Sequence, residues 1–240
     1  MDANLPLLAA EPVKAQRGWK LSPSDFAFLW EECPRCFYLK VALNQHRPRS
    51  LMPAIFNVID EQMKRHFAGR RVEEVIAGLA PGVFRCDEQW VESLPISVPG
   101  RASTCYIRGK LDSIIQFDDG SYAVVDFKTS EQSEGRVPLY SRQLHAYAHA
   151  LENAVPGRFA LRPVRRLGLL VFEPNAFSVD GGGSAVLSGP VAWIETARDD
   201  AAFLKFLGEV LSVLELPAPP APATGCDWCA FREFIRKSAL

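Results

Sequence analysis

The sequence SYAVVDFKT at residues 121–129 most constrains how this chain can fold, because it sets two charges in an apolar run. The Val and Phe residues are typical of a buried strand, yet Asp126 and Lys128 stand two positions apart and so point to the same side of a sheet. Burying either charge without a partner is costly. We therefore expect the two side chains to meet each other, a metal ion or a substrate.

Composition excludes some classes of protein. The chain has 240 residues, of which 48% are hydrophobic and 23% charged, as is typical of a globular protein. A net charge of -1 excludes a strongly basic nucleic-acid-binding coat but is compatible with a local basic channel. No apolar run approaches the roughly 20 residues of a membrane span, and we find no secretory signal. We expect a cytoplasmic protein without structural disulfides.

The spacing of apolar residues and turn signals predicts the order of helices and strands. The expected helices are residues 22–43 with an interruption at Pro34, then 54–67, 139–153, 197–216 and 225–240. The expected strands lie between residues 84 and 128, at 166–174 and in a pair that ends near Thr196. This order favours an α/β (α+β) fold in which a central mixed β-sheet is flanked by helices.

The two ends of the chain suggest its domain organisation. We expect residues 1–18 to form a flexible tail and residues 19–240 to form a single domain. Within that domain, PAPPAPAT at 217–224 is expected to be a stiff Pro/Ala linker before the terminal Cys-bearing helix.

Further polar residues accompany Asp126 and Lys128. Asp112 precedes Asp126 by 14 residues with a predicted hairpin turn between them, so antiparallel strands can bring the two carboxylates side by side. Their repulsion would raise a pKa, and Mg²⁺ or Mn²⁺ would remove that cost by taking both as oxygen ligands. Gln143 and Tyr147 follow four residues apart, and therefore share one face of a helix.

These elements resemble the PD-(D/E)XK nuclease superfamily, specifically its RecB/AddB-type branch, which also contains the CRISPR-associated adaptation exonucleases. The resemblance rests on G-x-x-D at 109–112, D-x-K-T at 126–129 and Q-x-x-x-Y at 143–147. It implies a restriction-endonuclease-like core and a Mg²⁺- or Mn²⁺-dependent deoxyribonuclease. It also implies exonuclease action on DNA ends or single strands, in DNA repair, recombination or defence, and leaves open a helicase or defence-system partner.

Carried over to this sequence, the resemblance implies that Asp112 and Asp126 bind the metal ion. The backbone carbonyl of Phe127 would complete the metal shell. Lys128 would assist the attacking water.

The resemblance implies that Gln143 and Tyr147 position the site and the DNA strand. Family members often carry a His in the early helix as a further metal ligand. Asp60 stands at the aligned position here, and Asp also ligates Mg²⁺. Glu61 and His66 are the alternatives to Asp60.

Two C-x-x-C pairs, Cys33–Cys36 and Cys226–Cys229, lie 190 residues apart, near opposite ends of the chain. Four thiolates suit either a tetrahedral zinc ion or a [4Fe–4S] cluster, and either would bring the N- and C-terminal Cys-bearing segments together. The RecB/AddB-type branch includes members with an iron–sulfur staple, built from one Cys near the N-terminus and three near the C-terminus. The resemblance therefore favours [4Fe–4S], and the two-and-two split keeps structural zinc as the alternative. A redox pair is a third option.

A second class of function stays open on the sequence alone. A non-catalytic DNA-binding or scaffold module with the same fold and metal staple would account for the departure at Asp60. The charge cluster of Asp112, Asp126 and Lys128 argues against it. Taken alone, however, Asp112 is typical of a solvated carboxylate near a turn, and Asp126 with Lys128 is typical of a surface ion pair. The basic residues that could line a phosphate channel are Arg47, Arg49, Lys64, Arg65, Arg70, Arg71, Arg162, Arg165, Arg166, Arg232, Arg236 and Lys237.

Overall fold

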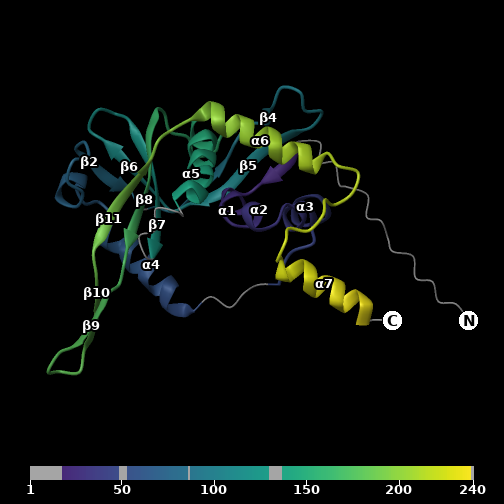
Figure 1. Ribbon diagram of the computed structural model, residues 1–240. Helices are drawn as coiled ribbons and strands as arrows, with labels where there is room; N and C mark the ends of the chain where they lie inside the picture. The colour runs from purple at the N-terminus through teal and green to yellow at the C-terminus, as the bar shows by residue number, and fades with distance from the viewer. Residues whose placement is uncertain (1–17, 49–52, 86, 130–136, 239–240) are drawn as a thin grey trace, which may run out of the picture.

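The computed structural model describes residues 18–48, 53–85, 87–129 and 137–238 (Figure 1). The tail expected at residues 1–18 lies outside this part of the chain, apart from Gly18. The described strands form sheets that helices cover, which confirms the predicted α/β fold with a mixed sheet flanked by helices.

The largest sheet has five strands in the order β11-β8-β7-β6-β2. Its strands are β11 (Val191–Thr196), β8 (Val164–Phe172), β7 (Tyr122–Thr129), β6 (Ser113–Phe117) and β2 (Gly82–Arg85). The central pair β7–β8 is parallel and the other three pairings are antiparallel. The strand that carries Asp126 and Lys128 is therefore the middle strand, which explains why Ala123, Val124, Val125 and Phe127 are apolar and buried.

A second sheet is connected to the first where strand β5 (Thr104–Leu111) is followed directly by β6. Strand β5 pairs with β1 (Trp19–Leu21), β3 (Gln89–Glu92) and β4 (Ile96–Ser97). Among the strands expected between residues 84 and 128, β5 and β6 are separated only by Asp112, where the chain passes from the second sheet into the first. The division follows from pairing, because β5 and β6 hydrogen-bond to different neighbours.

The helices near the N-terminus cover the second sheet. The expected helix at 22–43 is broken into α1 (Pro23–Ala27), α2 (Leu29–Glu32) and α3 (Pro34–Leu43). The interruption expected at Pro34 is confirmed, because Cys33 has extended backbone and α3 begins at the proline. Proline is well placed there, since the first helical residue needs no N–H partner.

The remaining helices are α4 (Ala54–Phe67), α5 (Val137–Glu152), α6 (Asp200–Leu214) and α7 (Asp227–Ser238). Helix α5 packs on one face of the five-stranded sheet and α4 on the other, while α6 packs against α5 and α3 (Figure 1). A two-stranded hairpin, β9 (Ala176–Val179) with β10 (Ala185–Ser188), projects from the body. No helix in the described ranges is long and apolar enough to cross a membrane.

Alternation along β7 assigns its side chains to two hydrophobic cores. Val124 belongs to the core that includes Leu144 of α5. Val125 and Phe127 belong to the opposite core, in which Phe127 stacks on Phe67 of α4 with ring centroids 6.0 Å apart. Residues 126 and 128 therefore face the α5 side of the sheet.

Gly168 in β8 provides a test of this packing. An added Cβ there would overlap the indole ring of Trp193 on the neighbouring strand β11. We expect Gly168→Ala to lower the free energy of unfolding by about 1–3 kcal/mol, measured by urea denaturation. Gly181→Ala is the control, because a Cβ at Gly181 meets nothing within 4 Å. Equal stability of the two variants would contradict this packing.

Candidate active site and four-cysteine site

Asp126 is the most buried carboxylate of the candidate site, with a relative exposure of 3%. Gln143 of α5 donates its amide Nε2 to Asp126 Oδ1 at 2.8 Å, and Lys128 Nζ pairs with Oδ2. Burial raises the pKa of Asp126 to about 6; the Lys128 ammonium opposes this rise and the nearby Asp112 carboxylate adds to it. The two charged residues of the D-x-K motif, Asp126 and Lys128, thus contact each other, and the Gln143 amide is a further partner of Asp126.

Asp112 lies beside Asp126, as the hairpin predicts. The antiparallel register pairs Ser113 with Val125, and one step further along the hairpin brings Asp112 opposite Asp126. The two carboxyl groups interact closely enough to disfavour ionisation of Asp126. The structure therefore places two carboxylates and a lysine at the junction between the two sheets.

Lys64 of α4 contacts the carboxylates of this site, whereas the sequence suggested it only as one of the basic residues that could line a phosphate channel. Its ammonium lies 2.8 Å from Asp60 Oδ2, 2.9 Å from Glu88 Oε1 and 3.0 Å from Asp112 Oδ1. Burial acts to lower the pKa of Lys64, but these three carboxylates outweigh it and hold the pKa above its ordinary value. Glu88 also pairs with Lys110, and both lysines keep its pKa low.

The arrangement around Lys64 suits a divalent cation. Asp60, Glu88 and Asp112 all contact the Lys64 ammonium, and Asp112 interacts with Asp126. Such carboxylates offer the hard oxygen donors that Mg²⁺ and Mn²⁺ prefer. A cationic group already lies among three of them, so the local field favours positive charge. A bound ion would compete with the ammonium of Lys64 for the same oxygens.

The contacts of Lys64 and Glu88 with this site differ in how far the sequence could have indicated them. The i,i+4 spacing of Asp60 and Lys64 on α4 is visible in the sequence and marks an ion pair. Glu88 comes just before β3 with no local pattern around it, and only the tertiary fold brings it to Lys64 and Lys110. The structure does not test the proposed role of the Phe127 carbonyl.

The two alternatives to Asp60 do not join the site. Glu61 pairs with Arg65 at 2.5 Å on the exposed side of α4. The His66 ring packs edge-on against Phe67, with centroids 5.0 Å apart. Of the early-helix candidates, Asp60 is the one that contacts the carboxylate cluster, and it does so through Lys64.

Gly109 and Tyr147 bring α1 and α5 close to β5. A Cβ at Gly109 would lie 2.7 Å from the Pro23 ring and 3.2 Å from the Tyr147 ring, so glycine permits this close approach. The Tyr147 hydroxyl donates to the Lys110 carbonyl at 2.7 Å. Burial raises the pKa of Tyr147, which keeps the hydroxyl protonated and able to donate.

A cavity of about 780 Å³ lies beside the two central carboxylates. Asp112, Asp126 and Lys128 share its wall with Gln143 and Tyr147. The cavity is also lined by side chains from the first helices and the second sheet, among them Lys20, Lys40, His46, Trp90, Arg108 and Lys110. The candidate carboxylates thus open into a space with basic walls.

The basic lining differs from the residues proposed from sequence. None of the described residues in that earlier set lines the cavity, and Arg49 lies outside the described residues. Arg71, for example, lies outside the cavity, where its guanidinium binds Asp118 at 2.6 Å and Glu73 at 2.8 Å. Clusters of basic residues along the sequence do not predict which of them line the cavity.

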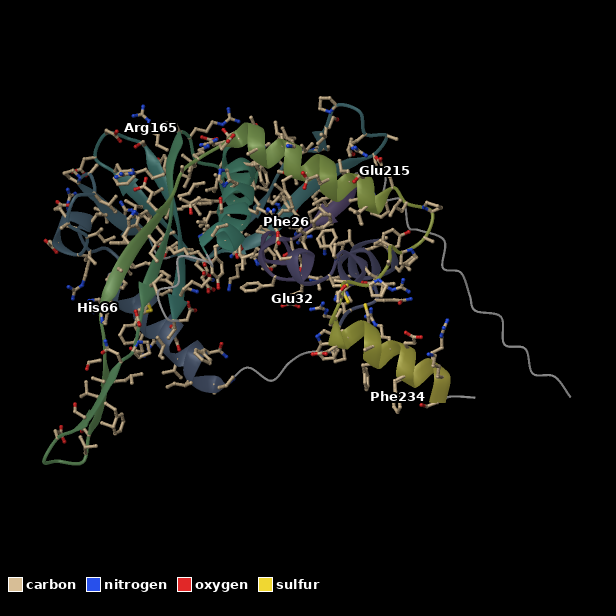
Figure 2. All side chains as sticks on the ribbon, viewed as in Figure 1. Phe26, Glu32, His66, Arg165, Glu215 and Phe234 are labelled. Atoms are coloured by element: carbon tan, nitrogen blue, oxygen red, sulfur yellow. The ribbon has the colours of Figure 1, made fainter. Side chains whose placement is uncertain are left out.

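The four paired cysteines come together, as predicted. Cys33 and Cys36 lie at the start of α3, and Cys226 and Cys229 at the start of α7, with all four sulfur atoms within 4.8 Å of one another. The sulfurs are visible between α3 and α7 in Figure 2. Such a group of thiols can hold a metal, and it joins the two Cys-bearing ends of the described chain.

Comparison with known proteins defines the class to which this fold and site belong. The family model of the PD-(D/E)XK nuclease superfamily matches residues 43–234. The chain therefore belongs to the PD-(D/E)XK nuclease superfamily. It is also similar to the solved structure titled "Crystal structure of SSO0001", with 20% sequence identity and a TM-score of 0.46 over 92% of this chain and 86% of that one. No curated protein matches the chain.

Replacing Lys64 tests the competition between its ammonium and a metal ion. In Lys64→Gln the carboxylates of Asp60, Glu88 and Asp112 lose their shared cation, so we expect Mn²⁺ to bind about tenfold more tightly. Electron paramagnetic resonance titration of free Mn²⁺ measures the change. Arg65→Gln on the same helix is the control, because Arg65 pairs with Glu61 away from the cavity. Unchanged or weaker Mn²⁺ binding in Lys64→Gln would contradict the competition.

Proposed function

We propose that this protein is a metal-dependent DNA nuclease that hydrolyses phosphodiester bonds, with Mg²⁺ or Mn²⁺ held by Asp112 and Asp126. One observation carries the proposal: the paired carboxylates and Lys128 line a basic-walled cavity. Membership of the nuclease superfamily supports it. A phosphodiester is an anion, so cationic walls attract it and a divalent ion offsets its charge at the reacting group.

Each side chain of the cavity has a distinct part in this proposal. The metal ion would supply a Lewis acid and a water of lowered pKa. Gln143 orients the Asp126 carboxylate through its 2.8 Å hydrogen bond, which fixes one ligand in advance. Lys128 would offset charge that develops on a phosphoryl oxygen. Tyr147 ties α5 to the Lys110 carbonyl and so holds the two halves of the site together.

We further propose single-stranded DNA or a DNA end as the substrate. A cavity of about 780 Å³ can take a segment of one strand but cannot enclose a duplex. Trp90 lines it with 56% of its surface exposed, and the Arg108 guanidinium lies 5.5 Å from the centroid of its ring. Aromatic and guanidinium faces of this kind stack on bases without regard to sequence.

The finer assignment to a RecB/AddB-type exonuclease rests on the G-x-x-D, D-x-K-T and Q-x-x-x-Y motifs. Such an enzyme would act in DNA repair, recombination or defence, with a helicase or defence-system protein as its partner. We place its action in the cytoplasm, because cysteines grouped for metal binding suit a reducing compartment.

Replacement of Asp126 tests the nuclease. The wild type should degrade single-stranded DNA labelled at the 5′ or 3′ end when Mn²⁺ or Mg²⁺ is present, and EDTA should stop the reaction. Asp126→Asn keeps the shape of the side chain but removes the metal-binding charge, so we expect activity to fall by more than about 100-fold. A gel-resolved product ladder measures the loss and separates exonuclease from endonuclease action.

Asp119→Asn is the matched control, because Asp119 lies in the turn of the same hairpin and outside the cavity. There its carboxylate accepts a hydrogen bond from the backbone N–H of Ser121. It should retain the activity of the wild type. A wild-type protein that binds DNA but does not cleave it would refute the proposed nuclease activity. That result would favour a non-catalytic DNA-binding or scaffold module.

Replacement of Trp90 tests the proposed substrate. Loss of one stacking contact costs about 1–3 kcal/mol, so Trp90→Ala should raise the KM for single-stranded DNA roughly tenfold with little change in kcat. Phe177→Ala is the control, because Phe177 is 70% exposed on β9 and does not line the cavity. An equal KM in the wild type and Trp90→Ala would exclude stacking on Trp90.

A further inference from the structure

We propose that Cys33, Cys36, Cys226 and Cys229 bind a single tetrahedral zinc ion, and that this ion clasps α7 to α3. The inference rests on the positions of the four sulfur atoms. It does not depend on the nuclease activity, so either proposal can fail without the other.

Three of the six sulfur–sulfur distances match the edges of a zinc tetrahedron, and all six are within 4.8 Å. Zn–S bonds of about 2.3 Å place two tetrahedral thiolates about 3.8 Å apart. Cys33 Sγ lies 3.8 Å from Cys229 Sγ, and Cys36 Sγ lies 3.8 Å from Cys226 Sγ and 3.6 Å from Cys229 Sγ. Each of these contacts joins one C-x-x-C pair to the other, so the two pairs share one centre.

An iron–sulfur cluster needs a wider cage. In a [4Fe–4S] cluster each thiolate binds a different iron, and four irons and four sulfides lie between the cysteines. Sulfurs that all lie within 4.8 Å of one another enclose room for one ion but not for eight cluster atoms. The geometry therefore favours zinc over the [4Fe–4S] cluster that the family resemblance suggested.

The surroundings of the four sulfurs suit negatively charged thiolates. Four thiolates around Zn²⁺ carry a net charge of −2, which nearby donors can offset. The Arg47 guanidinium donates to Cys226 Sγ at 3.7 Å, and the backbone N–H of Ala223 donates to Cys33 Sγ at 3.5 Å. Donors of this kind around the ligands stabilise a metal–thiolate centre.

Helix α7 depends on this centre for its position. None of its residues from Asp227 to Ser238 is buried, and Phe234 points away from the body (Figure 2). Beyond the cysteines and Trp228, it is held by the Arg232 guanidinium, which donates to the carbonyls of Gln45 and His46 at 3.3 and 3.2 Å. Too little apolar surface is covered to hold the helix without the metal.

The preceding linker is attached separately. Tyr38 donates its hydroxyl to the Leu216 carbonyl at 3.1 Å, and Arg35 donates to the Pro220 carbonyl at 2.9 Å. Both donors belong to α3, so loss of zinc should release α7 while residues 216–220 stay against the body.

Metal analysis of the full chain, purified without oxygen or added metal, is the first test. We expect about one zinc per chain by mass spectrometry, no iron–sulfur absorption in the visible, and tetrahedral cobalt–thiolate bands after exchange with Co²⁺. Cys229→Ser should lose the zinc and the cobalt bands. Cys105→Ala should keep both, because Cys105 is a buried thiol outside the cluster.

Two outcomes would overturn the zinc site. Four irons with acid-labile sulfide would establish the cluster instead. Four free thiols that take up neither Zn²⁺ nor Co²⁺ would exclude a metal altogether. Both results can be read whether or not the protein cleaves DNA.

Hydrogen exchange tests the clasp itself. Removing zinc with a thiol-competent chelator should increase amide exchange in residues 227–238 at least tenfold, with exchange in α6 unchanged. Restoring Zn²⁺ should reverse the change. Equal exchange in α7 with and without zinc would show that the ion does not hold the helix.

Discussion

Burial of the Asp126 carboxylate in the central strand constrains everything around it, because a charge with 3% exposure must find partners within the fold. Lys128 supplies one from the same strand and Gln143 another from α5. Burial nevertheless raises the pKa of Asp126, and the nearby Asp112 carboxylate adds to that rise. Two carboxylates held together at this cost make sense as ligands, since a divalent cation converts their repulsion into attraction.

Lys64 shows how the two faces of the sheet meet at one site. It comes from α4, which packs on the face opposite α5, and it reaches past the sheet junction to Asp112. The break between β5 and β6 makes this possible, since Asp112 lies where neither sheet continues. The site therefore combines residues from both layers, and the Lys64 ammonium balances part of its negative charge.

The four-cysteine group lies where α7 attaches to the body, and α7 contributes no buried residue to the hydrophobic core. Hydrophobic packing holds α5 and α6 in place, whereas α7 has no buried residue and contacts the body mainly through its cysteines and Arg232. A metal centre concentrates the needed stabilisation at one point, because binding several thiolates at once is strong even when little surface is covered. The proposed zinc and the nuclease site thus rely on separate interactions.

Local sequence determined much of this protein. Apolar periodicity predicted the main helices, Pro34 marked the break before α3, and the turn between Asp112 and Asp126 was enough to bring those two carboxylates together, because register follows from a short hairpin. Tertiary structure alone decided the rest. The approach of Lys64 and Glu88 to the site, and the spacing of four sulfurs that distinguishes one ion from a cluster, depend on contacts between distant segments. No local pattern encodes such distances, since they are set by how whole helices and sheets pack against one another.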